Sequence, residues 1–249
     1  MAEHRDVASR PTGGALMNPQ HSFENTPRVL IINPNTNRHV THSIQTLIHR
    51  LAPADVVTEV TSPAQGPAAI ETDQHKADAT QNVLALIEQR KAEGFAGYIM
   101  ACFDDIAIAQ ARALTQAPVI SLAEAAIRHA AASGGLFTVI TTFDEAVPTI
   151  ETLSTAYGLN ERCRVVATGI GVADTAAQTE RAEARLHEAI EEAIRLHSVA
   201  IVLGSGAFAG RAKALQQRYG IAISDGFAEA LAYTLNSNIK RSTRGFQRS

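Results

Sequence analysis

This chain of 249 residues contains a near-repeat of part of itself. Residues 98–127 and 200–231 follow one order: an apolar run, a short junction, an alanine-rich stretch, a second apolar run and a further helical pattern. The first junction is centred on Cys102 and the second on Ser205. Because a duplicated α/β unit can present equivalent junctions across a cleft, we expect a thiol and a hydroxyl group to face each other there.

Short apolar runs alternate with helical patterns along nearly the whole chain, which indicates parallel sheets joined by helices. The predicted strands are residues 28–32, 56–60, 97–101, 117–120, 137–141, 164–167, 199–203 and 221–224. Helices are predicted at 41–51, 73–93, from Asp104, from a capping box at Ser121, from a second capping box at Thr142 to Tyr157, and at 175–197, 209–219 and 225–235.

This pattern predicts an α/β fold with two pseudo-symmetric lobes, each a roughly four-stranded parallel sheet flanked by helices. We assign residues 28–134 to the first lobe, which residues 225–236 complete, and residues 135–224 to the second. Residues 1–27 are interpreted as a disordered leader and residues 237–249 as a flexible tail.

Composition excludes several classes of protein. An apolar content of 45% and a charged content of 19% are typical of a chain that buries a substantial core. The net charge of −3 gives no basic field for nucleic acid or an anionic membrane, and no apolar run is long enough to span a bilayer. Two cysteines form no disulfide framework, and we expect a cytoplasmic protein.

In parallel sheets, ligands bind beyond the carboxyl ends of the strands. Four short polar segments occupy such positions, and each precedes a helical pattern: 33–36, 102–105, 141–144 and 205–207. Backbone N–H groups at the start of a helix attract anions, so these segments could hold a carboxylate or an enolate oxygen.

Cys102 is the leading candidate for a catalytic residue. It follows a predicted strand and precedes a predicted helix, where thiol pKa values fall and thiolate becomes accessible. A thiolate in that position can remove a proton from carbon or attack a carbonyl. The alternative is a buried cysteine that packs as a small hydrophobe. Asp104 is interpreted most simply as a helix N-cap, and Cys163 as incidental.

No cofactor or metal is expected. The histidines at 39, 42, 49 and 75 are better explained as residues of polar helix faces than as zinc ligands, which must converge on one point. No phosphate-binding loop follows any predicted strand, and residues 204–206 lack the frame of a hydrolase nucleophile elbow.

The chain resembles the aspartate/glutamate/hydantoin racemase superfamily and is most similar to its hydantoin racemase branch. Four segments carry the resemblance in order: RVLIINPNTN (28–37), GYIMACFDD (97–105), FTVITTFDEAVPTIE (137–151) and AIVLGSGAFAG (200–210). The resemblance implies two pseudo-symmetric lobes with the site between them, and cofactor-free chemistry at a carbon next to a carbonyl. It also implies a homo-oligomer.

In the racemases of this family, two cysteines flank the reacting carbon, one removing a proton and the other returning one to the opposite face. Cys102 matches the first cysteine, whereas Ser205 stands at the second position. A serine hydroxyl is a poor carbon base, because its pKa lies far above neutrality. Three explanations stay open: an engineered exchange of cysteine for serine, a racemase that uses another acid such as water or Asp104, and a one-thiol enzyme.

The resemblance also carries over substrate-binding positions. Asn35 and Thr36 match a polar loop that contacts the substrate. Phe103 and Asp104 follow the cysteine, where backbone N–H groups meet the substrate. Thr141, Thr142 and Gly206 match the corresponding segments of the other lobe. Phe103 replaces a small polar residue that is common in the amino-acid racemases, which favours a less polar ligand than free aspartate or glutamate.

The function expected from the sequence is therefore an isomerase that acts on a small molecule, a hydantoin-like cyclic amide or related amino-acid derivative, with Cys102 as the thiolate acid/base. One alternative is a hydrolase that opens a cyclic amide or imide, or a decarboxylase, using Cys102 alone. Another is a small-molecule binding protein without catalysis.

Overall fold

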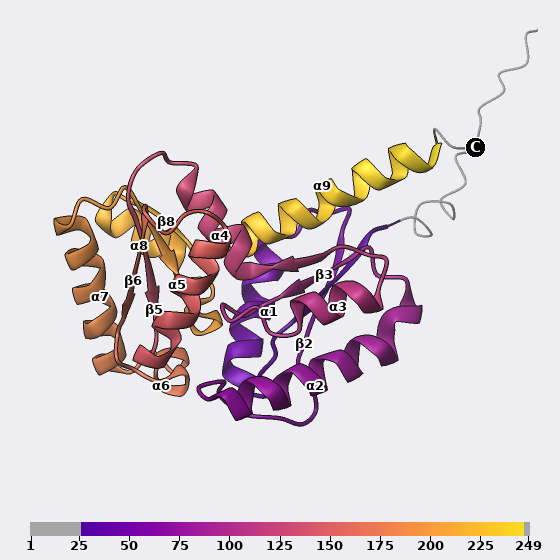
Figure 1. Cartoon of the computed structure of the whole chain (residues 1–249), viewed down its shortest axis with the longest axis horizontal. Helices are drawn as coiled ribbons and strands as arrows, with labels where there is room; N and C mark the ends of the chain where they lie inside the picture. Colours follow the sequence, from indigo (N-terminus) through magenta and orange to yellow (C-terminus); the bar gives the residue numbers. More distant parts are fainter. Residues whose placement is uncertain (1–25, 247–249) are drawn as a thin grey trace, which may run out of the picture.

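The computed structural model describes residues 26–246, which alternate strands and helices throughout (Figure 1). The first half contains β1 (Arg28–Ile32), α1 (Arg38–Leu51), β2 (Val57–Thr61), α2 (Asp73–Arg90), η2 (Lys91–Glu93), β3 (Gly97–Met100), α3 (Ile108–Leu114), β4 (Val119–Ser121) and α4 (Leu122–Ala131). The second half contains β5 (Phe137–Thr141), η3 (Asp144–Ala146), α5 (Val147–Ala156), β6 (Cys163–Ala167), α6 (Val172–Ala176), α7 (Glu180–Arg195), β7 (Ala200–Leu203), η4 (Gly206–Phe208), α8 (Ala212–Tyr219), β8 (Ala222–Ser224) and α9 (Phe227–Phe246).

The strands form two four-stranded parallel sheets with the same connectivity. The first sheet has the order β2-β1-β3-β4 and the second the order β6-β5-β7-β8. In register, β3 pairs with β1 through Met100 opposite Ile32, and β7 pairs with β5 through Leu203 opposite Ile140. The predicted α/β class with two similar sheets is confirmed. Equivalent central strands, β3 and β7, precede the two junctions.

The central strands are buried on both faces, as continuous apolar runs predict. All residues of β3, β5 and β7 are buried. Helices α4 and α9 lie where the two halves meet (Figure 1), and α4 packs against both α9 and the strands of the second sheet. Close packing of α9 on the first sheet requires Gly97, where a Cβ atom would lie 2.3 Å from Cγ2 of Thr234.

Several predicted boundaries differ from the structure. The helix expected from Asp104 begins at Ile108, after a loop in which Asp105 and Ala107 have positive φ angles, so Asp104 is not its N-cap. The capping box at Thr142 is absent, because a short 3-10 turn precedes α5 and no side chain caps either element. At Ser121 the cap is present, with Oγ accepting a hydrogen bond from the N–H of Glu124 at 3.0 Å.

The last helix continues through Phe246, so the part of the predicted tail between residues 237 and 246 is helical. Residues 247–249 and most of the predicted leader, residues 1–25, lie outside the described residues. Within residues 26–246, no helix combines the length and hydropathy that crossing a bilayer requires. The same residues contain no group of three His, Cys, Asp or Glu side chains arranged to hold a metal ion.

Candidate active site

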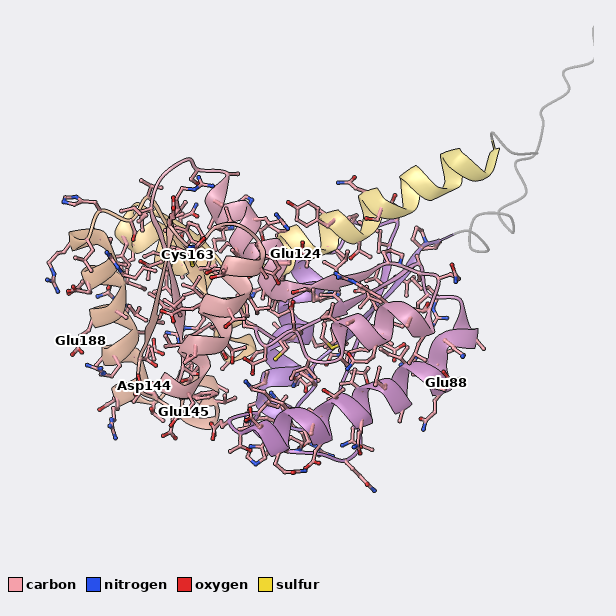
Figure 2. The ribbon with its side chains drawn as sticks, viewed as in Figure 1. Glu88, Glu124, Asp144, Glu145, Cys163 and Glu188 are labelled. Carbon is pink, nitrogen blue, oxygen red and sulfur yellow. The ribbon has the colours of Figure 1, made fainter. Side chains whose placement is uncertain are left out.

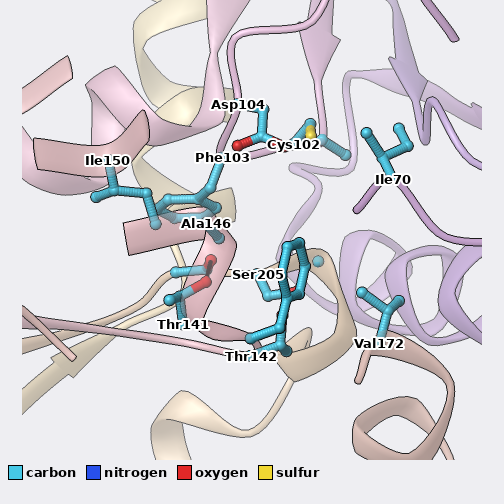
Figure 3. A pocket seen from close by; sticks show the side chains of 14 residues that line it. Ile70, Cys102, Phe103, Asp104, Thr141, Thr142, Ala146, Ile150, Val172 and Ser205 are labelled. Carbon is cyan, nitrogen blue, oxygen red and sulfur yellow. Dashed lines mark hydrogen bonds between the residues drawn. The ribbon is translucent and has the colours of Figure 1, made fainter. Parts of the chain in front are cut away.

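A pocket lies at the ends of the central strands and brings the two junctions together. Figure 3 shows Cys102 and Asp104 on one side of it and Thr141 and Thr142 on the other. It contains about 420 Å³ of empty space when the part open to solvent is included. Its lining residues are Ile70, Ala101, Cys102, Phe103, Asp104, Thr141, Thr142, Phe143, Ala146, Ile150, Val172, Gly204, Ser205 and Gly206.

The two junctions are held in equivalent ways. The N–H of Ala101 donates to the carbonyl of Ile32 at 2.9 Å, and the N–H of Gly204 donates to the carbonyl of Ile140 at 2.7 Å. Each junction therefore continues its central strand by one further bond to the neighbouring strand. The junctions also approach each other closely, since a Cβ atom on Gly206 would lie 3.3 Å from the carbonyl oxygen of Ala101.

Cys102 follows β3 in a tight turn, in which its N–H donates to the carbonyl of Met100 at 2.9 Å. Burial raises the pKa of its thiol, and the nearby charge of Asp104 raises it further. Backbone N–H groups of Asp104 and Phe103 act in the opposite direction. The expectation that a helix N-terminus lowers this pKa is wrong, because the loop to α3 moves the helix away from the sulfur and places two carboxylates near it.

The two aspartates that follow have different surroundings. Asp104 lines the pocket, and burial raises the pKa of its carboxyl group, while the ammonium group of Lys76 lowers it. Asp105 instead accepts hydrogen bonds from the hydroxyl groups of Ser121 and Tyr157, the latter at 2.8 Å. One aspartate therefore faces the pocket, and the other is engaged within the protein.

Ser205 follows β7 and presents its hydroxyl group to the same pocket. Its Oγ accepts a hydrogen bond from the N–H of Ala207 at 3.3 Å, at the start of the three-residue turn η4. No lysine, arginine or histidine is among the lining residues, so the pocket walls provide no basic side chain to activate this hydroxyl. Cys102 and Ser205 therefore supply one pocket with an ionisable thiol and a neutral alcohol.

Thr141 and Thr142 line the pocket from the end of β5. The Thr141 hydroxyl donates to the carbonyl of Gly204 at 3.2 Å, which ties it to the Ser205 junction. The carbonyl of Thr142 accepts from the N–H of Ile170 and the hydroxyl of Thr168. Both threonines are buried, so they form this wall of the pocket but have little surface accessible to solvent.

The structure does not bring Asn35 and Thr36 to this pocket. The carboxamide oxygen of Asn35 accepts from the side chain of Asn33 and from the N–H of Asn37, within its own loop. The N–H of Thr36 donates to the carbonyl of Pro67 at 3.0 Å. Both residues organise the start of α1 and the adjoining loop, and a role for them in substrate binding stays a prediction.

Sequence reasoning missed the apolar part of the pocket. These residues come from the loop before α2, from the segment around η3 and α5, and from α6: Ile70, Phe143, Ala146, Ile150 and Val172. Each is an ordinary core residue by type, so no sequence signal distinguishes it from the hydrophobic interior. Cys163 is absent from the lining; it begins β6 in the second lobe (Figure 2), and burial raises its pKa to about 11.

Known proteins are similar to this chain in sequence and in fold. A family model described as Asp/Glu/Hydantoin racemase matches residues 29–234. The hydantoin racemase of Rhizobium meliloti is 33% identical over 203 residues, covering 81% of this chain and 84% of that protein. The hydantoin racemase of Pseudomonas sp. (strain NS671) is 27% identical over 208 residues, covering 83% of this chain and 84% of that protein.

Among solved structures, the allantoin racemase from Klebsiella pneumoniae superimposes with a TM-score of 0.80 at 28% identity, covering 84% of this chain and 86% of that chain. The superposition covers most of this chain and shows the same fold with two parallel sheets.

Proposed function

Because the chain belongs to the Asp/Glu/hydantoin racemase family, we propose that this isomerase moves a proton at an acidic carbon beside the carbonyl group of a hydantoin-like cyclic amide. Cys102 acts as the thiolate acid/base, and Ser205 occupies the opposite catalytic position. The observation that supports this most directly is the shared pocket: residues 102 and 205 follow equivalent strands and line one cavity.

The reaction begins with Cys102 in its thiolate form. The sulfur takes the proton from the carbon, and the electron pair of that C–H bond moves into an enolate whose charge rests on the carbonyl oxygen. Backbone N–H groups at Phe103, Asp104 and Gly206 are candidates to stabilise that oxygen. Cys102 can return the proton to the same face, which regenerates the starting enantiomer.

Inversion requires a proton on the opposite face. A hydroxyl group donates it only by becoming an alkoxide, whose pKa is far from neutral and which has no basic partner in the pocket lining. Water or the Asp104 carboxyl group are the alternative donors. We therefore expect proton removal by Cys102 to outpace inversion.

The pocket lining favours a neutral substrate. Most of the lining side chains are apolar, and no cationic side chain is among them to pair with a substrate carboxylate. Asp104 would further repel an anion. The resulting preference is for a cyclic amide with an apolar substituent rather than for aspartate or glutamate.

Exchanging the residue opposite Cys102 tests this proposal. Ser205→Cys is expected to raise the rate of racemisation of a resolved 5-substituted hydantoin by about 100-fold, the lower end of what a positioned acid contributes. Polarimetry measures the rate, and Cys102→Ala should abolish it. Cys163→Ser is the matched thiol control, since Cys163 lies outside the pocket lining, and should leave the rate unchanged.

Product analysis separates the alternatives. Racemisation that is equal in Ser205→Cys and the unsubstituted chain would contradict the role given to position 205. Release of a ring-opened acid that depends on Cys102 would instead identify the one-thiol hydrolase, and carbon dioxide release from a malonate would identify the decarboxylase. A ligand that raises the melting temperature without turnover would identify a binding protein.

A further inference from the structure

Asp105 has an unusual backbone and an unusual set of partners for a residue that does not line the pocket. Its φ angle is +50°, in the left-handed region that non-glycine residues rarely occupy, and Ala107 follows with +59°. Such conformations are strained and persist only where the surrounding structure holds them. The partners of the Asp105 carboxylate provide that restraint.

The two carboxylate oxygens of Asp105 bind different parts of the molecule. Oδ1 accepts from the hydroxyl of Ser121, at the end of β4 in the first sheet. Oδ2 accepts from the hydroxyl of Tyr157, at the end of α5 beside the second sheet, at 2.8 Å. One side chain therefore joins the segment that carries Cys102 to both halves of the protein.

Each hydroxyl donor is itself held in place. Ser121 Oγ also accepts from the N–H of Glu124, so its own proton is directed to Asp105. The ring of Tyr157 lies beneath the guanidinium group of Arg128, with 5.2 Å between the guanidinium carbon and the ring centroid. Helix α5, which Tyr157 ends, also supplies Ile150 to the pocket wall.

We propose that Asp105 is a positioning residue, which fixes the Cys102–Asp104 segment against the pocket wall by linking it to Tyr157 and Ser121. Its role rests on the proposed function of Cys102. In this arrangement, the sulfur has one fixed orientation toward the substrate. The separation between the sulfur and the pocket wall formed by α5 is fixed as well. A displacement of about 1 Å at a reacting group can reduce a rate by about 100-fold, so a small loosening is enough to matter.

The charge of Asp105 has a separate, measurable effect on the sulfur. Its negative charge is one of the influences that raise the pKa of Cys102, after burial and the charge of Asp104. The other charged groups that act on Asp105 are Glu124 of α4 and Arg112 of α3, which have opposite effects on its pKa. Replacing the carboxylate therefore changes thiol ionisation, whereas deleting only the Tyr157 hydroxyl releases the link and retains the charge.

Two variants distinguish positioning from a general structural role. Tyr157→Phe is expected to lower kcat by about 10-fold with KM nearly unchanged, and to increase the alkylation rate of Cys102 by iodoacetamide at a fixed thiolate fraction. Asp105→Asn is expected to lower kcat similarly and to move the pH midpoint of alkylation to lower values. Peptide mass spectrometry distinguishes Cys102 from Cys163, and thermal unfolding checks that each variant is folded.

The matched control is Tyr219→Phe, which deletes another partly buried tyrosine hydroxyl, bonded to Nδ1 of His187 at 2.6 Å on the far side of the second sheet. It should change neither kcat nor alkylation. Because alkylation of Cys102 needs no turnover, the alkylation measurement still tests the positioning role even if no hydantoin is racemised. The proposal is overturned if Tyr157→Phe alkylates Cys102 at the rate of Tyr219→Phe, or if Asp105→Asn leaves the alkylation midpoint unchanged.

Discussion

At the scale of single residues, the pocket contains one sulfur whose surroundings oppose its ionisation. Burial and the charges of Asp104 and Asp105 raise the pKa of Cys102, and backbone N–H groups offset this only in part. These influences favour the thiol over the thiolate form of Cys102. A bound substrate changes the balance between thiol and thiolate, because its own N–H groups can stabilise the thiolate. Catalytic hydrogen bonds often tighten only in such a complex.

This predicts a steep alkaline dependence. Because the folded-state pKa of Cys102 is raised, the thiolate fraction at pH 7 is small and grows as the pH rises. Between pH 7 and pH 9, the alkylation rate of Cys102 should rise by about tenfold per unit, as expected below the pKa of a nucleophile. A rate that has already reached its plateau at pH 7 would show that the thiol ionises readily and would contradict this account.

The contrast between Cys102 and Cys163 was predictable from sequence, whereas the state of the Cys102 thiol was not. Position beyond a strand end separates the two cysteines. The pKa of Cys102 depends first on burial, then on the charge of Asp104, and less on the charge of Asp105. The position of the Asp105 carboxylate is set by hydrogen bonds from Ser121 and the distant Tyr157. Tyr157 carries no sequence signal of its own, because a tyrosine at the end of a helix is ordinary.

At the scale of elements, strand ends determine the site more firmly than helix starts. The short apolar runs before Cys102 and Ser205 form β3 and β7 as predicted, and each junction repeats the same bond to its neighbouring strand. The predicted helix starts at Asp73 and after Ser121 agree with the structure, whereas those at Asp104 and Thr142 do not. Turns such as η3 and η4 precede the helices, and local composition does not distinguish such a turn from a first helical turn.

The variant Gly206→Ala tests whether activity depends on the close approach of the two junctions. Gly206→Ala would place a methyl group 3.3 Å from the carbonyl oxygen of Ala101 and 3.6 Å from Val40, so the junctions must separate slightly. We expect a fall of about 10-fold in kcat/KM, since the spacing between the catalytic positions changes, with little change in melting temperature.

Gly204→Ala is the comparison for that variant. Its methyl group would lie 2.5 Å from Cγ1 of Val139, inside the second sheet, so it should lower the melting temperature. The interpretation fails if Gly206→Ala retains full activity or if its only effect is unfolding.

At the scale of the whole molecule, two sheets of identical strand order position the site between them. The repeated order of predicted strands and helices along both halves of the chain predicted this architecture, because the same order of elements in each half favours similar lobes. The crossing of α4 and α9 between the halves was only partly predictable, since their apolar faces do not identify the sheet they cover. A homo-oligomer stays a prediction that light scattering can check.

The central claim is that Cys102 serves one face of the reacting carbon and Ser205 serves the other poorly. The most direct measurement follows each enantiomer of a 5-substituted hydantoin in heavy water, recording deuterium at the ring carbon by NMR and optical rotation in the same sample. We predict that one enantiomer exchanges its proton faster than it loses rotation, and that Cys102→Ala exchanges neither beyond the uncatalysed rate. Equal rates of exchange and inversion for both enantiomers, or exchange that survives Cys102→Ala, would contradict the account.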